Sequence, residues 1–222
     1  MRKTAILGSI ALFLSPISKA ADIVREGRCM YIMENGRKTG EMCSAAKPVS
    51  MEEMTKRMSS LNIEKLLKDS GMRAHYGGFE TSTLIKAIIS VENSSVDPDA
   101  ISQAGAVGLM QLMPETAALT EYELRNPEKN LLVGIRHFDC LYNRHSIKYG
   151  KDAIRFALAE YLVGKSNLEK VINGHRVRNW KELENVVDMN MRNLSDSNGT
   201  TVVSYTERII SNYFKLKKGR KK

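Results

Sequence analysis

The sequence predicts a mainly α-helical protein with a small β-hairpin extension near its N-terminus. Apolar residues recur at helical spacing through most of the chain from Thr81 onward. Before that region, two strand-like runs flank Asn35-Gly36, a pair that is typical of a two-residue hairpin turn. With 222 residues and 42% hydrophobic side chains, the chain is long enough for one domain with a substantial core plus a small extension.

The first twenty residues are typical of a secretory signal peptide. Arg2 and Lys3 precede an apolar stretch from Ala5 to Leu14, and small residues lead up to Ala20. The apolar stretch is too short to span a bilayer. We therefore expect removal of residues 1–20 near Ala20 and a periplasmic or secreted mature protein without a transmembrane segment.

The three cysteines suggest one disulfide and one free thiol. Cys29 and Cys43 lie at the two ends of the predicted hairpin, nearly opposite each other, so a disulfide between them is expected outside the cytoplasm. Cys140 is left over and is expected to be a buried free thiol. It shares a helix face with His137, but two ligands do not make a metal site, and we predict no metal.

A helical segment links the hairpin to the main domain. Ser50 and Glu53 have the spacing of a capping box, and the helix they open should reach Gly71 with a break near Ser59-Ser60. Gly77-Gly78 is interpreted as a hinge. The expected segments are a signal peptide (1–20), an N-terminal extension (21–78), a catalytic domain (79–214) and a basic tail (215–222).

A lone carboxylate ends the most apolar helical run of the chain. Residues 83–92 have helical periodicity, and Ser94, Ser95, Asp97 and Pro98 then predict a loop. Glu92 therefore lies in the last turn, where the helix dipole and apolar neighbours raise a carboxyl pKa, as a general acid requires. Taken alone, Glu92 is equally compatible with an exposed residue at a helix end.

The loop after Glu92 leads into a glycine-containing segment, Gly105-Ala-Val-Gly-Leu-Met-Gln-Leu-Met-Pro-Glu-Thr-Ala117. Its glycines permit tight turns and a close backbone approach to a ligand. Ser102 and Gln111 offer hydrogen bonds to hydroxyl or acetamido groups, and Met110 offers a pliable apolar wall. Pro114 suits the first position of the following helix.

This segment, with Pro98-Asp-Ala-Ile-Ser102 before it, resembles the lytic transglycosylases that have a goose-type-lysozyme fold and cut the glycan strands of bacterial peptidoglycan. The resemblance covers about residues 80–215. It implies a lysozyme-like α+β fold that is mainly helical, with Glu92 as the catalytic residue. The substrate-binding residues that it implies are Ser102, Gly108, Leu109, Met110, Gln111, Tyr161 and Tyr205.

Two tyrosines extend the resemblance. Residues 157–164, AlaLeuAlaGluTyrLeuValGly, are similar to the family's Ala-Tyr-Asn-Ala-Gly segment. Tyr161 matches the tyrosine whose hydroxyl binds the catalytic carboxyl, and Tyr205 stands where a tyrosine of the substrate cleft is expected. Either one alone is more often a half-buried packing residue.

The chain departs from the family pattern at three places. Asn93 replaces the usual serine after the acid, although Ser94 or Ser95 could substitute for it. Pro98 lies one residue farther from Glu92 than usual, and Leu162 replaces an asparagine. These changes leave the acid in place but could alter rate or substrate choice.

The resemblance implies a mechanism with one carboxylate and no cofactor. Glu92 would cleave the bond between N-acetylmuramic acid and N-acetylglucosamine and form a 1,6-anhydro end, whereas ordinary glycosidases use two carboxylates. Asp97 and Asp99 are more simply interpreted as turn-capping residues. Two alternatives stay open: a hydrolytic muramidase, and a weakly catalytic or non-catalytic wall-binding assembly factor of a secretion system.

The positive charge is concentrated at the C-terminus. The formal net charge is +9, and six of the last eight residues are Lys or Arg. Such a tail is usually solvated and disordered, but it could also contact anionic polymers, membranes or partners. The rest of the chain has no basic nucleic-acid-binding module, so no nucleic-acid partner is expected. Glycan strands are the expected partner, with secretion-system or wall-synthesis proteins as further candidates.

Overall fold

In this computed structural model, the described parts of the chain are residues 49–189, 195 and 200–219, together with three strands near the N-terminus. The strands β1 (Asp22–Glu26), β2 (Cys29–Glu34) and β3 (Arg37–Cys43) form an antiparallel sheet in the order β1-β2-β3. Cys29 and Cys43 are register partners, as the predicted hairpin requires, and β1 adds a third strand. The cysteine side chains and the proposed signal peptide lie outside the described part, so the disulfide and the cleavage site stay predictions.

The main compact unit starts earlier than predicted. The chain divides into units at Met1–Ser44 and Ala45–Lys222, whereas the sequence suggested a boundary after residue 78. The helices α1 (Met51–Ser59) and α2 (Ile63–Asp69) belong to the second unit because their apolar faces join the main core of that unit. The residues that make this contact are Met54, Met58, Ile63 and Leu67.

The predicted start of α1 is confirmed, but the hinge is not. Ser50 Oγ accepts a hydrogen bond from the Glu53 backbone N–H at 3.2 Å, and α1 ends at the expected break after Ser59. Gly77 and Gly78 have φ values of +49° and +87° and form the two-residue turn between β4 (His75–Tyr76) and β5 (Phe79–Glu80). Two successive positive φ angles suit the turn of a tight hairpin, so these glycines shape a hairpin rather than a hinge.

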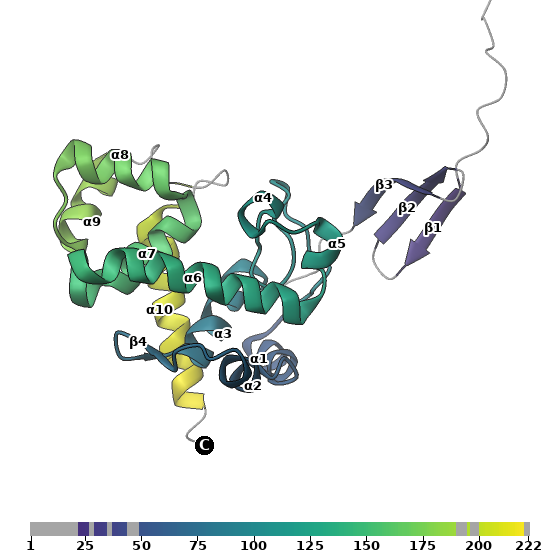
Figure 1. The fold of residues 1–222 in the computed structure, drawn as a ribbon, viewed down its shortest axis with the longest axis horizontal. Helices are drawn as coiled ribbons and strands as arrows, with labels where there is room; N and C mark the ends of the chain where they lie inside the picture. Colours follow the sequence, from purple (N-terminus) through teal and green to yellow (C-terminus); the bar gives the residue numbers. More distant parts are fainter. Residues whose placement is uncertain are drawn as a thin grey trace, which may run out of the picture. The chain divides into compact units, whose positions relative to one another are not determined.

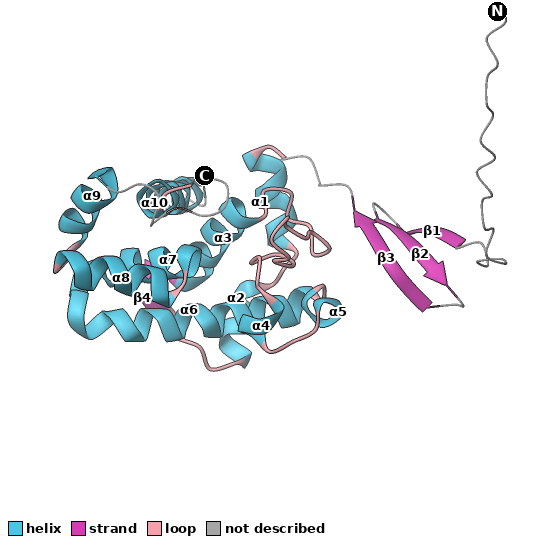
Figure 2. Cartoon of the chain, turned by 90° about the horizontal axis from the view of Figure 1, so that it is seen from above, coloured by secondary structure: helices cyan, strands magenta, loops and turns pink. Residues whose placement is uncertain are grey.

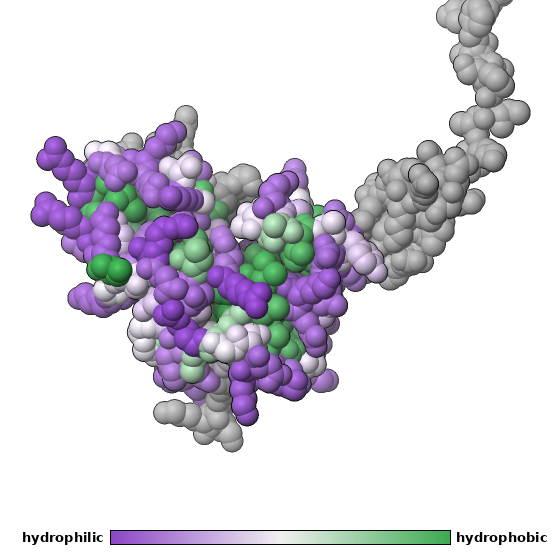
Figure 3. All heavy atoms as spheres, in the orientation of Figure 1, coloured by the Kyte–Doolittle hydropathy of each residue, from purple (hydrophilic) through white to green (hydrophobic). Residues whose placement is uncertain are grey.

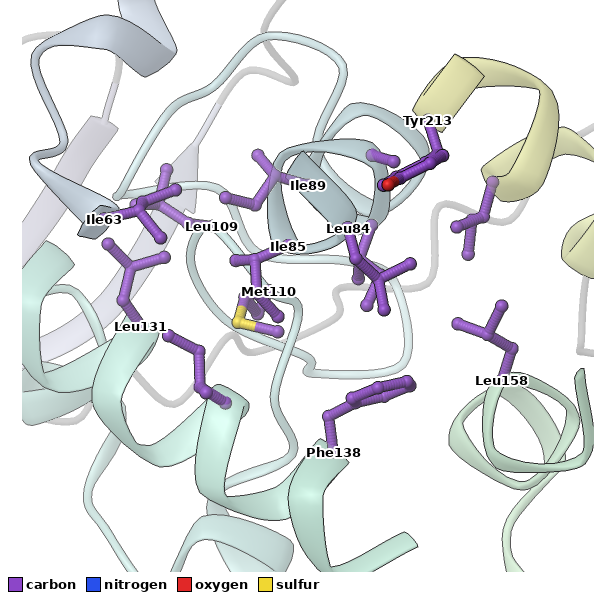
Figure 4. Packing of buried hydrophobic residues seen from close by; sticks show 14 of the residues in the cluster. Ile63, Leu84, Ile85, Ile89, Leu109, Met110, Leu131, Phe138, Leu158 and Tyr213 are labelled. Atoms are coloured by element: carbon purple, nitrogen blue, oxygen red, sulfur yellow. The ribbon is translucent and has the colours of Figure 1, made fainter. Parts of the chain in front are cut away.

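A buried helix, α3 (Thr81–Glu92), is the centre of the second unit. It packs against α10 (Val202–Gly219), and α10 also packs against α7 (Ala153–Val163), which lies beside α6 (Pro127–Tyr149). Figure 1 shows α10 running past α3 from the far end of the sequence. Figure 4 shows Leu84, Ile85 and Ile89 of α3 among apolar side chains from other elements. The helix is therefore apolar on nearly every face because protein surrounds it.

Further helices complete the unit, and helices dominate the described residues, as predicted (Figure 2). They are α4 (Pro114–Ala117), α5 (Glu121–Leu124), a 3₁₀ turn (Gly150–Asp152), α8 (Lys165–His175) and α9 (Trp180–Met189). Pro114 is the first residue of α4, as expected. A second apolar cluster lies under α8 and α9, where the rings of Tyr149 and Phe156 stack 3.7 Å apart and Trp180 meets Phe156 edge-on.

Two expectations about the surface are wrong. Cys140 is exposed because it lies on the outer side of α6, and it is a free thiol. The predicted basic tail begins as a helix, since α10 continues to Gly219. In the view of Figure 3, hydrophilic side chains cover most of the face, and hydrophobic ones show in patches between them. Of the described helices, none has both the length and the apolar character needed to cross a membrane.

Gly134 allows α6 to approach the segment that contains Met110. A Cβ atom on Gly134 would stand 2.4 Å from Met110 Sδ and 3.1 Å from Met110 Cβ. Met110 is fully buried, so its side chain has no free direction in which to move. The glycine is thus a packing requirement in the middle of a helix.

We predict that Gly134→Ala lowers the free energy of unfolding by about 1–3 kcal/mol, because the added methyl group overpacks the core. Urea denaturation followed by circular dichroism measures this change. Gly174→Ala is the matched control: Gly174 is also helical but has open space around it, so alanine there should stabilise by up to about 1 kcal/mol. Equal effects at the two positions would contradict the packing argument.

Candidate active site

Glu92 is the last residue of α3, as the sequence predicted. The helix ends there because the next residue, Asn93, leaves the helical conformation while its backbone N–H still binds the Ile89 carbonyl at 2.8 Å. The Glu92 side chain is half-buried at the end of an otherwise buried helix. A carboxyl group is thus held where core packing fixes its backbone and solvent still has access.

Tyr205 is the residue that binds this carboxyl group. Its hydroxyl donates a short hydrogen bond to Glu92 Oε1, and the tyrosine is only 2% exposed near the start of α10. Burial, followed by the negative charge of Glu92, raises the pKa of Tyr205 well above its usual value. The hydroxyl therefore remains a donor throughout the physiological pH range.

Tyr161 has a different contact from the one predicted. Its hydroxyl donates to the Met110 carbonyl at 2.6 Å, so the expectation that it binds Glu92 directly is wrong. Burial, and next the charge of Glu92, raise the pKa of Tyr161 well above its usual value, which places both tyrosines in the same electrostatic environment. The His137 ring lies 5.5 Å from the Tyr161 ring, centroid to centroid. The assignments of the two tyrosines are thus exchanged: Tyr205 reaches the acid, and Tyr161 fixes the backbone beside it.

Asn93 organises the loop that follows the acid. It is 4% exposed, and its Nδ2 donates to the carbonyls of Asp97 at 2.6 Å and Gly108 at 3.0 Å. Its Oδ1 accepts from Ser95 Oγ at 2.8 Å and from the Asp97 backbone N–H at 3.1 Å. A serine side chain could not make all four bonds. The departure from the family pattern at Asn93 therefore accompanies the longer loop and anchors it.

The two aspartates of this loop have structural contacts. Asp97 Oδ1 accepts from the Asp99 backbone N–H at 3.1 Å, which is the turn-capping contact predicted for this pair. Between Asn93 and Asp97, Val96 has a φ of +51°, which is unfavourable for a β-branched residue. The bonds of Asn93 to both sides of Val96 hold the chain in this conformation.

Gly108 is a glycine because protein atoms surround it. Its φ is +81°, and a Cβ would stand 2.3 Å from Asn130 Nδ2 and 2.8 Å from the Leu124 carbonyl oxygen. Asn130 is fully buried and bonds to three backbone groups: its Oδ1 accepts from Met110 N–H at 2.9 Å, and its Nδ2 donates to Val107 O at 2.9 Å and Leu124 O at 3.0 Å. The sequence suggested that a sugar approaches the backbone at this glycine. In the structure, the side-chain amide of Asn130 occupies that position.

The polar residues of the segment support its own backbone. Ser102 Oγ accepts from the Ala106 N–H at 3.0 Å, and Gln111 Nε2 donates to Gly108 O at 2.8 Å and Ala100 O at 3.3 Å. Both side chains are partly exposed, so their remaining hydrogen-bonding capacity faces outward.

The apolar residues of the segment lie in the core. Leu109 and Met110 have no exposed area, so the prediction that Met110 offers an apolar wall to a ligand is wrong. Leu109 and Met110 pack against α3 and α6 because the loop folds inward at these two positions (Figure 4). Only their backbone atoms could contact a ligand.

Sequence reasoning missed two buried polar anchors. The contacts of Asn130 were not foreseen, although its spacing of four residues from Gly134 puts both on the helix face that meets the Met110 segment. Glu160, 4% exposed, binds Arg144 and also His145 Nε2 at 2.6 Å. Glu160 lies in the apolar run of α7, and a charged residue in such a run predicts a buried side chain with a charged or hydrogen-bonding partner.

The raised tyrosine pKa values predict a loss of stability at alkaline pH. An unfolded tyrosine ionises near pH 10, whereas Tyr161 and Tyr205 ionise well above that in the folded state. Their contribution is fully present below about pH 10 and is lost as pH rises toward the folded pKa. In urea denaturation from about pH 8 to about pH 11, the free energy of unfolding should fall less steeply with pH in Tyr205→Phe than in the unmodified protein. Tyr122→Phe, at a side chain 86% exposed, should leave the pH dependence unchanged, and an equal decline in both variants would contradict this assignment.

Comparisons with known proteins find one matching family model and several similar proteins. Residues 76–183 match the family model described as Transglycosylase SLT domain. The chain is 32% identical over 118 residues to membrane-bound lytic murein transglycosylase E of Buchnera aphidicola, which covers 47% of this chain and 51% of that protein. It is 39% identical over 72 residues to endo-type membrane-bound lytic murein transglycosylase A of Klebsiella pneumoniae, covering 27% and 35%. The chain thus spans about half or less of the length of these relatives.

Two solved structures share the fold. An inactive mutant of the lytic transglycosylase Slt from Pseudomonas aeruginosa aligns with a TM-score of 0.53 at 18% identity, over 73% of this chain and 24% of that one. The 70 kDa soluble lytic transglycosylase from Escherichia coli aligns with a TM-score of 0.50 at 19% identity, over 78% and 25%. Residues 76–183 thus resemble a transglycosylase SLT domain, and the two solved structures show that the chain shares the fold of these proteins.

Proposed function

We propose that this protein is a peptidoglycan lytic transglycosylase that cleaves the β-1,4 bond between N-acetylmuramic acid and N-acetylglucosamine, with Glu92 as its sole acid and base. The observation that carries the proposal is the carboxyl group of Glu92 at the solvent-accessible end of a buried helix, bound by the buried hydroxyl of Tyr205. The names of the relatives, all murein transglycosylases, support the substrate class.

The reaction needs one carboxyl group acting twice. Glu92 first donates its proton to the glycosidic oxygen as the bond to C1 of the muramic acid breaks, and the substrate acetamido group stabilises the positive charge at C1. The Glu92 carboxylate then accepts the proton of the C6 hydroxyl as that oxygen bonds to C1. The product has a 1,6-anhydro ring, no water is consumed, and Glu92 regains its proton.

The neighbouring residues keep the acid in place. Tyr205 holds Oε1 through a donor that does not ionise near neutral pH, so it cannot compete for the transferred proton. Tyr161 fixes the Met110 carbonyl and with it the loop backbone at that residue. We assign substrate contacts to the partly exposed side chains of Ser102, Gln111 and Tyr161 and to the backbone of residues 108–110.

The site favours transglycosylation over hydrolysis. Asp97, the nearest acidic residue along the chain, already caps the turn at Asp99, whereas a hydrolase normally positions a second carboxylate across the bond. Glycan strands are the proposed partner in the periplasm or outside the cell, after loss of residues 1–20. Secretion-system and wall-synthesis proteins remain candidates for further partners.

Glu92→Gln should abolish cleavage while leaving the fold intact, because glutamine keeps the shape and an acceptor for Tyr205 but has no proton to transfer. Mass spectrometry of peptidoglycan digests measures the outcome. The unmodified protein should release fragments lighter by one water than hydrolytic products, and the variant none. Hydrated fragments would assign a muramidase, and a folded protein that binds glycan without releasing fragments would assign a wall-binding factor.

Asn93→Ala should destabilise the protein by about 2–4 kcal/mol and lower kcat, because the four hydrogen bonds of a buried side chain are lost together. Asn93→Ser tests the family residue in this longer loop and should recover only part of both losses. Steady-state turnover of peptidoglycan, measured with thermal unfolding, separates the two effects. A variant with native stability and native kcat would show that the Asn93 bonds do not position the acid.

A further inference from the structure

An apolar pocket lies away from Glu92, between α1, α3 and the last turns of α10. It has a volume of about 670 Å³ and is lined by Met51, Thr55, Met58, Thr83, Leu216 and Gly219, among others. Thr83 is at the start of α3 and Leu216 near the end of α10, whereas Glu92 and Tyr205 are at the opposite ends of these two helices. At 1.5 Å per residue, Tyr205 and Leu216 are about 16 Å apart along α10. The pocket is therefore separate from the catalytic site.

Lysines from three helices also line this pocket. Lys56 comes from α1, Lys86 from α3 and Lys215 from α10. Lys86 is paired with Glu64 at 2.9 Å, and Glu52 also lines the pocket, so the local excess of positive charge comes from Lys56 and Lys215. Lys218 stands one turn after Lys215 on the same side of α10 and is exposed.

The apolar pocket distinguishes the lysines around it from the charged residues that are common at helix ends. Lysines in the last turn of a helix are favoured by the helix dipole, and this alone accounts for Lys56 and Lys218. The dipole does not account for an open apolar hollow between the lysines, with Met51 38% exposed at its rim. An apolar hollow surrounded by cations fits a ligand that has an apolar part and an anionic part.

We propose that this pocket and its lysines form a docking site for a leaflet of anionic phospholipid. Acyl chains near the headgroups would contact the apolar hollow, and phosphate groups would pair with Lys56, Lys215 and Lys218. In the sequence, Arg220, Lys221 and Lys222 add positive charge after Gly219. This run of charge favours an extended anionic surface as the partner, rather than a single helix of another protein.

Docking in this way gives the enzyme an orientation. The lipid contacts one end of the α3–α10 pair, so the opposite end, with Glu92 and Tyr205, points away from the leaflet. This consequence for glycan cleavage rests on the proposed function, whereas lipid binding itself does not. The two are tested by separate readouts.

The test is sedimentation of the full chain with vesicles of phosphatidylcholine that contain about one third phosphatidylglycerol. Binding should be strong at about 0.1 M salt, weak at about 1 M salt, and weak to vesicles of phosphatidylcholine alone. The Lys56→Gln/Lys215→Gln/Lys218→Gln variant should bind roughly a hundredfold more weakly, on the basis of about a fivefold loss for each lysine near the surface.

A matched variant separates this site from net charge. Lys151→Gln/Lys170→Gln/Lys181→Gln removes the same charge from exposed positions outside the pocket and should bind like the parent. Because residues 1–20 are the same in all variants, their own affinity for lipid does not produce the difference. Equal losses in the two triple variants would overturn the proposal, as would unchanged binding in both.

A reporter at the pocket tests the apolar contact. In the Met51→Trp variant, fluorescence should be quenched by vesicles that carry brominated acyl chains, while the unmodified protein, whose Trp180 is 5% exposed, should show little quenching. Absence of quenching would exclude insertion at the pocket. Binding of an acidic amphipathic peptide without vesicle binding would assign the site to a protein partner instead. Release of glycan fragments by each variant, measured without vesicles, serves as the check of folding.

Discussion

The active site depends on one buried amide, the side chain of Asn130. Its three hydrogen bonds reach the backbone on both sides of Gly108 and the end of α5, and they hold a loop that contains little regular structure. A buried loop is costly unless its backbone groups are bonded, and Asn130 supplies partners where no helix or sheet can. The same helix carries Gly134, whose missing side chain leaves room for Met110. From that fixed loop, the carbonyls of Met110 and Gly108 reach Tyr161 and Asn93.

Around this loop, the candidate active site is assembled from distant parts of the chain. Glu92 comes from the end of α3, and Tyr205, 113 residues later, comes from the start of α10. They meet because α3 and α10 pack side by side, with Asn212 also donating to Ser90 Oγ at 2.9 Å. The hydrogen bond at the acid is thus the end of a helix–helix interface. A change in the packing of that interface would be transmitted directly to the carboxyl group.

The loop after Glu92 departs from the pattern of the family that the chain resembles. In the loop before Pro98, Val96 has a left-handed conformation, and Asn93 has a side chain that bonds to residues on both sides of it. The extra residue and the asparagine are therefore best understood together. Leu162 packs against both apolar clusters, which is a structural reason for an apolar residue there.

The sequence by itself determined the features that local patterns encode. Apolar periodicity predicted α3 and placed Glu92 in its last turn, Ser50 and Pro114 marked helix starts, and the glycine-containing segment indicated the family. Only the tertiary structure decided which tyrosine reaches the acid, because both were compatible with the site and the choice depends on how α7 and α10 pack. It also placed Met110 in the core and Cys140 at the surface. Burial depends on contacts between segments far apart in sequence, and periodicity along one helix does not specify them.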